Sequence, residues 1–227
     1  MDHQNPQKYL KGISIQVCLN GYSFKVDGRS SGWLGADTVF TVPELQHRYG
    51  SVKISLLTPK VALVPSAFYC EASAGELLSE TVALESGDAV AGIPVPEYSA
   101  VLVYSLSIGE MLSGAISAAV KDGDGNSVPV LPEMYYILKD LGRLSEHNRI
   151  VASFGGGYLH LGIAQGDNLL LANVFRAADF TTAEYFLFMA IRRLQMNPEV
   201  SSVHFRTPLS DEMEMSLYRY FRSVEKI

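Results

Sequence analysis

An acidic segment, Asp122-Gly123-Asp124-Gly125-Asn126, carries the sharpest metal-binding pattern of the sequence when Glu133 is counted with it. Asp122, Asp124, Asn126 and Glu133 fall at positions 1, 3, 5 and 12 of the loop, the ligand spacing of calcium-binding helix–loop–helix proteins. Ser127 stands where that loop needs a glycine for its sharp turn, and two prolines interrupt the remainder. We therefore expect a solvated turn here and predict no metal ligands in the chain.

A run of three glycines, Gly155-Gly156-Gly157, is the second feature that could do chemistry, because glycine-rich loops hold phosphates through backbone amides. A phosphate-binding loop also needs Lys followed by Ser or Thr, and then a helix. Here Tyr158 begins an apolar strand pattern instead. A hairpin turn is the favoured interpretation, with close approach of an anion to the glycine backbone left open.

The remaining nucleophiles and metal-ligand types show no catalytic spacing. The five histidines include no pair four residues apart on a helix, and no serine lies in a Gly-x-Ser-x-Gly segment. Cys18 and Cys70 have apolar neighbours and are interpreted as small packed side chains. No catalytic residue and no cofactor is predicted from these residue types.

The composition excludes several classes of protein. The 227 residues are 48% apolar and 19% charged, which is enough for one substantial core or two small ones. A net charge of -6 gives no footprint for nucleic acid. No run approaches the ~18 apolar residues of a membrane span, and the first residues lack the order of a signal peptide. We expect a cytoplasmic protein with no direct membrane insertion.

The first half of the chain alternates strand and helix patterns. Asn20-Gly21 is the dipeptide that best tolerates positive φ in a two-residue turn, and Thr41 with Glu44 matches a capping box that opens a short helix. Residues 67–96 give the weakest signal, with a helix over 74–84 and a loop over 85–96. The other expected elements are a hairpin over 13–26, strands over 33–40, 52–57, 61–64, 100–106 and 128–131, and helices over 109–120 and 132–141.

The second half gives a similar series. Thr181 with Glu184 is again a capping-box pattern, opening a helix to Leu194, and Ser210 is a good N-cap for a last helix. Strands are expected over 149–154, 158–164, 168–175 and 203–206.

Three landmarks recur in the same order in the two halves. Asn20-Gly21-Tyr22 matches Gly156-Gly157-Tyr158, the two capping boxes match, and Ser51 to Ile54 matches Ser202 to Phe205. We interpret this as an internal duplication with lobes over 1–127 and 128–227. The alternative is two ordinary α/β stretches that obey the same local chemistry.

A three-strand meander, a helix and a parallel strand, occurring twice, resembles the actin-like and ribonuclease-H-like folds. The segment Leu57 to Pro65 and the strand–helix–strand–helix over 101–141 resemble an uncharacterised bacterial family assigned an actin-like ATPase fold. More distantly they resemble the actin-like assembly proteins of type IV pili and type II secretion. The resemblance implies a duplicated α/β fold, with a mixed sheet flanked by helices in each lobe.

In active members of that superfamily, the first hairpin of each lobe carries Asp-x-Gly, whose carboxylate organises Mg²⁺ and water. With Gly21 as the motif glycine, the acidic position holds Leu19, and in the second lobe it holds Ser153, Phe154 or Gly155. Because phosphoryl transfer depends on positioning and charge neutralisation, both lobes should be catalytically impaired.

The sequence therefore predicts a non-catalytic actin-like protein that serves as an interaction or scaffold module, with another protein as its partner. The alternative is a nucleotide-binding protein or weak ATPase that uses the cleft between lobes, with acids from Asp37, Asp167 or Asp179. The residues that would face a nucleotide are those of the two hairpins, namely Asn20, Gly21, Tyr22, Ser23, Gly155, Gly156 and Gly157.

Overall fold

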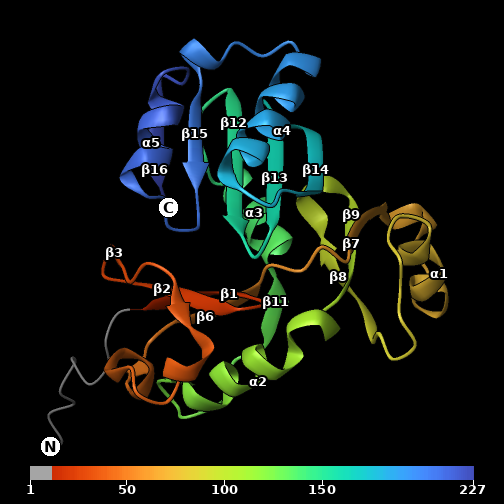
Figure 1. Ribbon diagram of the computed structural model, residues 1–227. Helices are drawn as coiled ribbons and strands as arrows, with labels where there is room; N and C mark the ends of the chain where they lie inside the picture. The colour runs from red at the N-terminus through yellow and green to blue at the C-terminus, as the bar shows by residue number, and fades with distance from the viewer. Residues whose placement is uncertain (1–11) are drawn as a thin grey trace, which may run out of the picture. The chain divides into compact units, whose positions relative to one another are not determined.

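The computed structural model describes residues 12–227, which divide into two compact units (Figure 1). The first unit contains the chain up to Leu56 together with Gly109–Leu131. The second contains Leu57–Ile108 together with Pro132–Ile227. No helix within residues 12–227 has the length and apolar character that crossing a bilayer requires.

The first unit is built on a mixed sheet whose strands run in the order β11-β6-β1-β2-β3, with β4 also paired to β2. Strand β1 pairs antiparallel with β2 and parallel with β6, so the chain must cross over before it returns to β1. The strands are β1 (Ile13–Cys18), β2 (Gly21–Val26), β3 (Arg29–Ser30), β4 (Leu34–Gly35), β6 (Val52–Leu56) and β11 (Val130–Pro132).

Helix α2 (Glu110–Ala119) and short elements complete this unit. Two 3₁₀ helices, Ala36–Thr38 and Pro43–Gln46, lie in the connection between β4 and β6. A small parallel ladder joins β5 (Arg48–Tyr49) to β10 (Lys121–Asp122). Core side chains of these elements, such as Ile15, Ile54 and Ile116, are fully buried.

The first hairpin forms as expected, but its turn is displaced by one residue. Cys18 pairs with Gly21, so the turn residues are Leu19 and Asn20. Neither Asn20 nor Gly21 is among the described residues with positive φ, so the expected turn geometry at this dipeptide is wrong. Gly21 is required for another reason: a Cβ there would lie 2.2 Å from the carbonyl oxygen of Leu34 on β4.

Two expectations for residues 33–50 are wrong. The strand expected over 33–40 is reduced to the two residues of β4, and a 3₁₀ turn follows directly. The expected capping box does not form, because the 3₁₀ helix begins at Pro43 after Val42 and has no side-chain cap. The Thr41 hydroxyl instead donates to the Thr38 carbonyl oxygen at 3.0 Å. Proline at the first helical position fixes this start, since it needs no N–H partner there.

The second unit is built on a larger sheet in the order β14-β13-β12-β15-β16. Strands β12, β13 and β14 form an antiparallel meander, while β15 lies parallel to β12 and β16 parallel to β15. The strands are β12 (Asn148–Gly155), β13 (Tyr158–Gln165), β14 (Asn168–Arg176), β15 (Ser202–Phe205) and β16 (Ser223–Lys226). The sequence analysis did not predict β16.

Helices cover both faces of this sheet (Figure 1). Helices α4 (Phe180–Arg193) and α5 (Asp211–Tyr218) pack on one face, against side chains such as Leu161 and Phe205. Helix α3 (Glu133–Leu141) packs on the other face against Val151 and Ala164. A further 3₁₀ turn spans Pro198–Val200.

Capping of α4 also differs from expectation. Its N-cap is Asp179, whose carboxylate accepts a hydrogen bond from the Thr182 amide at 2.7 Å, so the capping box expected at Thr181 is wrong. The N-cap of α5 is Ser210, as predicted, and its side chain accepts from the Met213 amide.

Residues 57–108 form a small sheet in the order β7-β9-β8, with helix α1 on one face. Its strands are β7 (Val61–Pro65), β8 (Val90–Val95) and β9 (Ala100–Ser105), and its helices are α1 (Ala74–Ser79) and the 3₁₀ turns Ser66–Phe68, Glu71–Ser73, Pro96–Tyr98 and Ser107–Gly109. Helix α1 ends at Ser79 rather than at residue 84. The loop expected over 85–96 contains β8 instead. The other face of the sheet packs against α3 through Leu102.

The two larger sheets repeat one topology. In each, the third, second, first, fourth and fifth strand patterns lie side by side in that order, and the first strand runs parallel to the fourth. Ile15 pairs with Ile54 in the first sheet, and Ala152 with Phe205 in the second. The predicted duplicated α/β fold is therefore confirmed. The lobe boundaries 1–127 and 128–227 stay a prediction, and the compact units interleave along the chain.

Candidate functional site

In the first hairpin, most of the predicted site residues are buried within their own unit. Tyr22 is fully buried, and its hydroxyl lies 2.9 Å from the Thr38 Oγ1 atom. Burial raises the pKa of Tyr22. Ser23 is also buried and donates to the Gln16 Oε1 atom at 3.3 Å. Of the predicted site residues in this hairpin, Asn20 alone is exposed, at the turn. Neither turn residue, Leu19 or Asn20, has a carboxylate.

In the second hairpin, the three glycines form the predicted turn. Gly155 pairs with Tyr158, and the two turn residues Gly156 and Gly157 have φ of 60° and 82°. Positive φ at both positions is the geometry that glycine adopts most readily, which explains the run. The Gly157 carbonyl oxygen accepts from the Ala177 amide at 2.9 Å, which closes the far side of the turn.

Directly behind this hairpin lies a buried polar cluster that sequence reasoning missed. Ser153 Oγ donates to Glu133 Oε1 at 2.6 Å, and Arg206 Nε donates to the same oxygen at 2.7 Å. Arg206 Nη1 is paired with Asp140 Oδ2. The side chains of Glu133 and Arg206 are 0% and 7% exposed, so the central ion pair is shielded from water.

The topology explains why residues so distant in sequence meet. Ser153 lies one residue beyond Ala152 on β12, and Arg206 one residue beyond Phe205 on the parallel strand β15, and these two partners face each other. Carboxyl ends of parallel strands lie at the same edge of a sheet. Glu133 begins α3 and Asp140 lies two turns later, on the same side of the helix. One guanidinium can therefore reach both acids.

The cluster contains two carboxylates and one guanidinium, and Glu133 Oε2 has no hydrogen-bond partner among the described residues. Burial alone lowers the pKa of the Arg206 guanidinium, but the carboxylates of Glu133 and Asp140 outweigh burial and leave this pKa above its ordinary value. The guanidinium also lies over the Tyr136 ring, 5.2 Å from its centroid. Arg206 is thus a permanent cation beside Ser153, the position where the Asp-x-Gly motif expects an acid if Gly155 is its glycine.

A buried histidine lies across the strand pair from this cluster. His160 pairs with Ser153 in the β12–β13 register, and its Nε2 lies 3.0 Å from the Thr58 carbonyl oxygen. Its Nδ1 has no partner among the described residues. Burial lowers the pKa of His160, so the ring is neutral at pH 7. Within residues 12–227, no three His, Cys, Asp or Glu side chains gather in a way that could hold a metal ion.

The acidic segment singled out in the sequence forms a turn. Asp122 Oδ1 accepts from the Asn126 amide at 2.7 Å, and the Asp122 amide donates to the Asn126 carbonyl oxygen at 3.1 Å. Glu133, the twelfth position of the pattern, belongs to the other unit and is occupied by Arg206 and Ser153. The observed contacts are those of an aspartate-stabilised turn.

The three acids considered for the nucleotide-binding alternative have different surroundings. Asp37 lies in the exposed 3₁₀ turn after β4. Asp167 is fully exposed in the β13–β14 turn, with Arg149 Nη2 at 3.8 Å. Asp179 caps α4, and the hydrogen bonds from Thr182 hold its pKa below the ordinary range. Asp179 is therefore already engaged in helix capping.

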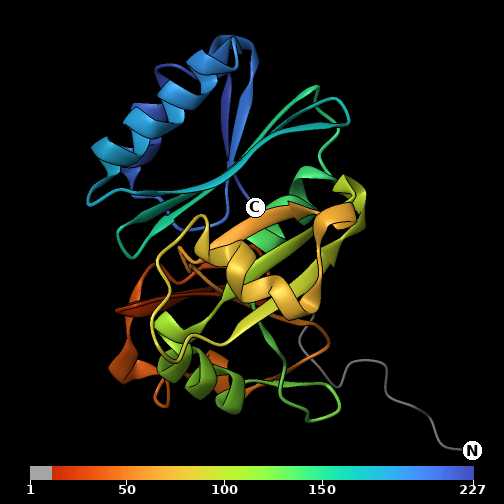
Figure 2. The same ribbon diagram turned by 90° about the vertical axis from the view of Figure 1, so that its right-hand side faces the viewer.

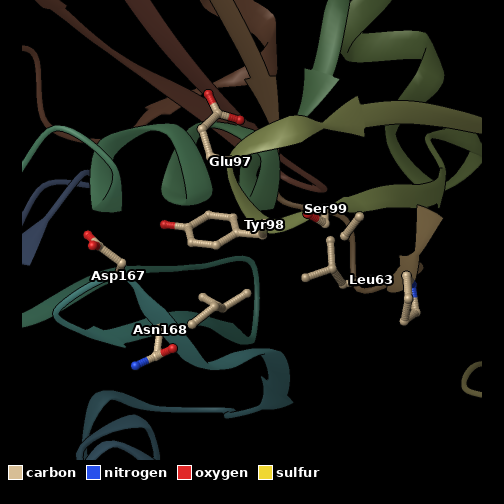
Figure 3. Close-up of a pocket in the computed structure, with 9 residues that line it drawn as sticks. Leu63, Glu97, Tyr98, Ser99, Asp167 and Asn168 are labelled. Carbon is tan, nitrogen blue, oxygen red and sulfur yellow. The ribbon is translucent and has the colours of Figure 1, made fainter. Parts of the chain in front are cut away.

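A pocket of about 430 Å³ lies between the small sheet and the start of β14 (Figure 3). The Tyr98 ring extends across it, and its hydroxyl donates to the Leu138 carbonyl oxygen of α3 at 3.5 Å. Asp167, in the β13–β14 turn, and Asn168, the first residue of β14, lie on the opposite side from Glu97 in this view. Glu97 at the rim is paired with Lys139 at 2.5 Å. The lining residues are Leu63, Pro65, Glu97, Tyr98, Ser99, Ala100, Asp167, Asn168 and Leu169. The pocket offers apolar contact and a polar rim, without a nucleophile activated by a neighbouring base.

Comparison with solved structures indicates the class of fold. A Bacteroides thetaiotaomicron protein described as having an actin-like ATPase fold and unknown function is 17% identical, with a TM-score of 0.63 over 100% of this chain and 94% of that one. Together with the duplicated topology, this comparison shows an actin-like ATPase fold.

The chain belongs to the family described as protein of unknown function (DUF3822), whose model matches residues 8–224. Two further structures share the fold at 14% identity and a TM-score of 0.51. The PilM-PilN type IV pilus biogenesis complex matches over 96% of this chain and 88% of that one. The cytoplasmic domain of EpsL, an inner membrane component of the type II secretion system of Vibrio cholerae, matches over 88% of this chain and 83% of that one. A comparison with the curated proteins finds no match.

Proposed function

We propose that this chain is a non-catalytic member of the actin-like fold that acts in the cytoplasm as an interaction or scaffold module. The observation that carries the proposal is the state of the second hairpin. Ser153 stands at an expected acid position, and the acid it contacts, Glu133, is already neutralised by Arg206. The Arg206 guanidinium thus already supplies, beside the Glu133 carboxylate, the positive charge that a divalent cation would supply in an active site.

The electrostatic argument can be made for both hairpins. Phosphoryl transfer by such folds relies on carboxylates that hold Mg²⁺ against the phosphates. In the first hairpin, Tyr22 and Ser23 are buried and bonded to neutral partners, Thr38 and Gln16. In the second, a Mg²⁺ ion beside Glu133 would have to displace a buried guanidinium. Both sites therefore favour a structural role over hydrolysis.

The structural relatives support the choice of an interaction role. One of the structures that shares the fold is a complex of two proteins, and another is a component of a secretion system. These likenesses extend to the fold, and the role of an assembly protein is proposed here by analogy.

The test combines nucleotide hydrolysis with thermal unfolding. We expect no Mg²⁺-dependent phosphate release from ATP and no shift of the melting temperature with ATP or ADP. A specific binder at 100 times its Kd would gain about 2.7 kcal/mol, which a thermal scan detects easily. The matched variants are Asp37→Asn, Asp167→Asn and Asp179→Asn, the last of which keeps a good helix cap.

Metal-dependent hydrolysis that disappears in one of these three variants would overturn the proposal. It would identify the acid used and would establish the alternative, a nucleotide-binding protein or weak ATPase. Nucleotide-dependent stabilisation without hydrolysis would establish binding alone and would also contradict a pure scaffold.

A further inference from the structure

Strand β14 is an edge strand of the second sheet, and its outer backbone groups are not paired with another strand in the part of the chain that the structure describes. The strand has nine residues and none of them is buried, whereas its neighbour β13 is buried over six of its eight residues. In an antiparallel strand about half of the backbone N–H and C=O groups point away from the paired neighbour. Within residues 12–227, these outward groups of β14 have no backbone partner. Figure 2 views the molecule from this side.

The other sheet edges of the described chain are protected. Natural proteins keep edge strands short, or place proline and charge in them, to prevent pairing with other chains. Strands β3, β4, β5 and β10 have two residues each, and β16 has four with two adjacent charges. Strands β7, β8 and β11 each contain a proline, at Pro65, Pro94 and Pro132. Among the sheet edges within residues 12–227, only β14 is long and free of proline, and its one charged residue is Arg176 at its end.

The small sheet contacts β14 through side chains and does not pair with its backbone. Val61 and Leu63 of β7 belong to the same apolar cluster as Leu169, Ala172 and Val174 of β14. These contacts are made by side chains on the α3 face of the strand. The backbone groups in the plane of the sheet are not used by β7, because β7 pairs only with β9.

The sequence of β14 is complementary to itself in the antiparallel direction. Leu170 is the extra residue of a bulge, since Ile163 pairs with Leu171 and Ala164 with Leu169. A twofold axis at Ala172, counted through that bulge, places Val174 opposite the partner's Leu169. The same register places Arg176 opposite the partner's Asp167.

Charge supports this register at both ends. Asp167 is fully exposed and its nearest cation is 3.8 Å away, while Arg176 is exposed with no ion pair among the described residues. The symmetric arrangement forms two Asp–Arg pairs, in each of which Asp167 lies between its own Arg149 and the partner's Arg176. We infer that a second copy of this chain pairs with β14 and joins the two sheets into one ten-stranded sheet. The inference rests on the proposed function as an interaction module and names its partner.

Cysteine cross-linking tests the register directly. Cys70 is exposed, so the packed position expected for it from sequence is wrong, whereas Cys18 is buried as expected. In a Cys70→Ser background, which removes this exposed thiol, Ala172→Cys places two thiols on the twofold axis. Directly opposed residues have Cα atoms about 4.5–5.5 Å apart, within the range that a disulfide spans. The matched control is Asn173→Cys, whose copies would be about 8 Å apart, too far to bridge. We expect a disulfide-linked dimer from Ala172→Cys and little from Asn173→Cys.

Exchange of the two charged residues provides a second test of β14 pairing. Light scattering of the wild-type protein should give twice the chain mass of 24.8 kDa. Arg176→Glu should weaken the dimer by about ten-fold or more, because it puts two acids opposite each other at both ends. The double variant Asp167→Arg/Arg176→Glu should restore it.

A wild-type protein that stays monomeric and gives no Ala172→Cys cross-link would overturn the inference. Cross-linking through Asn173→Cys instead would also overturn it. So would a dimer whose stability is the same in wild type, in Arg176→Glu and in Asp167→Arg/Arg176→Glu. These results leave the hydrolysis test untouched, so failure of the pairing and failure of the non-catalytic assignment can be told apart.

Discussion

Replacing Arg206 by methionine should be the most damaging single change in the buried cluster. The substitution keeps much of the side-chain volume but removes the donors to Glu133 and Asp140 and the contact with the Tyr136 ring. Glu133 is fully buried, so its carboxylate would lose the charged partner that it has among the described residues while staying shielded from solvent. Removing one partner of a buried ion pair costs about 3–5 kcal/mol.

Urea unfolding at pH 7 measures this cost, and thermal unfolding should show it as a drop of roughly 6–20 °C at about 2–4 °C per kcal/mol for a chain of this size. The matched control is Arg143→Met, because Arg143 also pairs with Asp140, at 3.2 Å, but its side chain is 64% exposed. An exposed pair of this kind is worth about 0–1 kcal/mol.

The double variant Glu133→Gln/Arg206→Met completes the experiment. Glutamine can still accept from Ser153, and no uncompensated charge remains, so the double variant should be more stable than Arg206→Met alone. The reasoning is refuted if Arg206→Met costs no more than Arg143→Met, or if the second substitution adds to the loss instead of relieving it.

Two further predictions concern ionised carboxylates outside the cluster. Asp88 accepts from Lys60 Nζ at 2.6 Å, which holds the pKa of Asp88 at about 2 rather than 3.8, so the folded state binds fewer protons than the unfolded chain between these values. Asp88→Asn should therefore be less stable than wild type at pH 7, and the difference in melting temperature should shrink as the pH falls from about 4 to about 2; a constant difference would contradict this. In a denaturant titration, Asp179→Ala should lower the free energy of unfolding by about 1 kcal/mol through loss of the α4 cap. Thr181→Ala should change it by less than about 0.5 kcal/mol. A larger loss from Thr181→Ala than from Asp179→Ala would show that Thr181 is the N-cap, as the sequence pattern predicted.

The elements with strong periodicity could be predicted from sequence, and those decided by tertiary contacts could not. The β12–β13 hairpin was predictable, since Gly156 and Gly157 supply the positive φ that the turn needs. Strand β8 was not, because Gly92 and Pro94 suggest a loop. Both are tolerated there because β8 is an edge strand paired only with β9.

Capping patterns failed where a neighbour offered a better cap. Thr181 and Glu184 have the spacing of a capping box, but Asp179, two residues earlier, accepts the Thr182 amide and starts the helix sooner. A carboxylate at the N-terminus also interacts favourably with the helix dipole. Spacing alone does not show which of several acceptors wins.

Of the candidate site, the sequence predicted only that the two hairpins lack acidic residues. The lack of acids at the hairpins is visible in sequence, and it motivated the non-catalytic interpretation. The contact of Glu133 with Arg206 joins residues 73 positions apart and depends on the parallel register of β12 and β15. No local pattern of charge marks it, because Arg206 looks like any other basic residue in a late, mixed-charge segment.

The interleaving of the two units has a consequence for synthesis on the ribosome. The small sheet can cover one face with α1 as soon as residue 105 has emerged, through contacts such as Val103 with Leu78. Its other face, which includes Val95 and Leu102, packs against α3, and that helix ends at Leu141. At about 5–20 residues per second, the nascent chain presents this apolar face for roughly 2–7 s. During that interval it is the surface that a ribosome-associated chaperone would meet first.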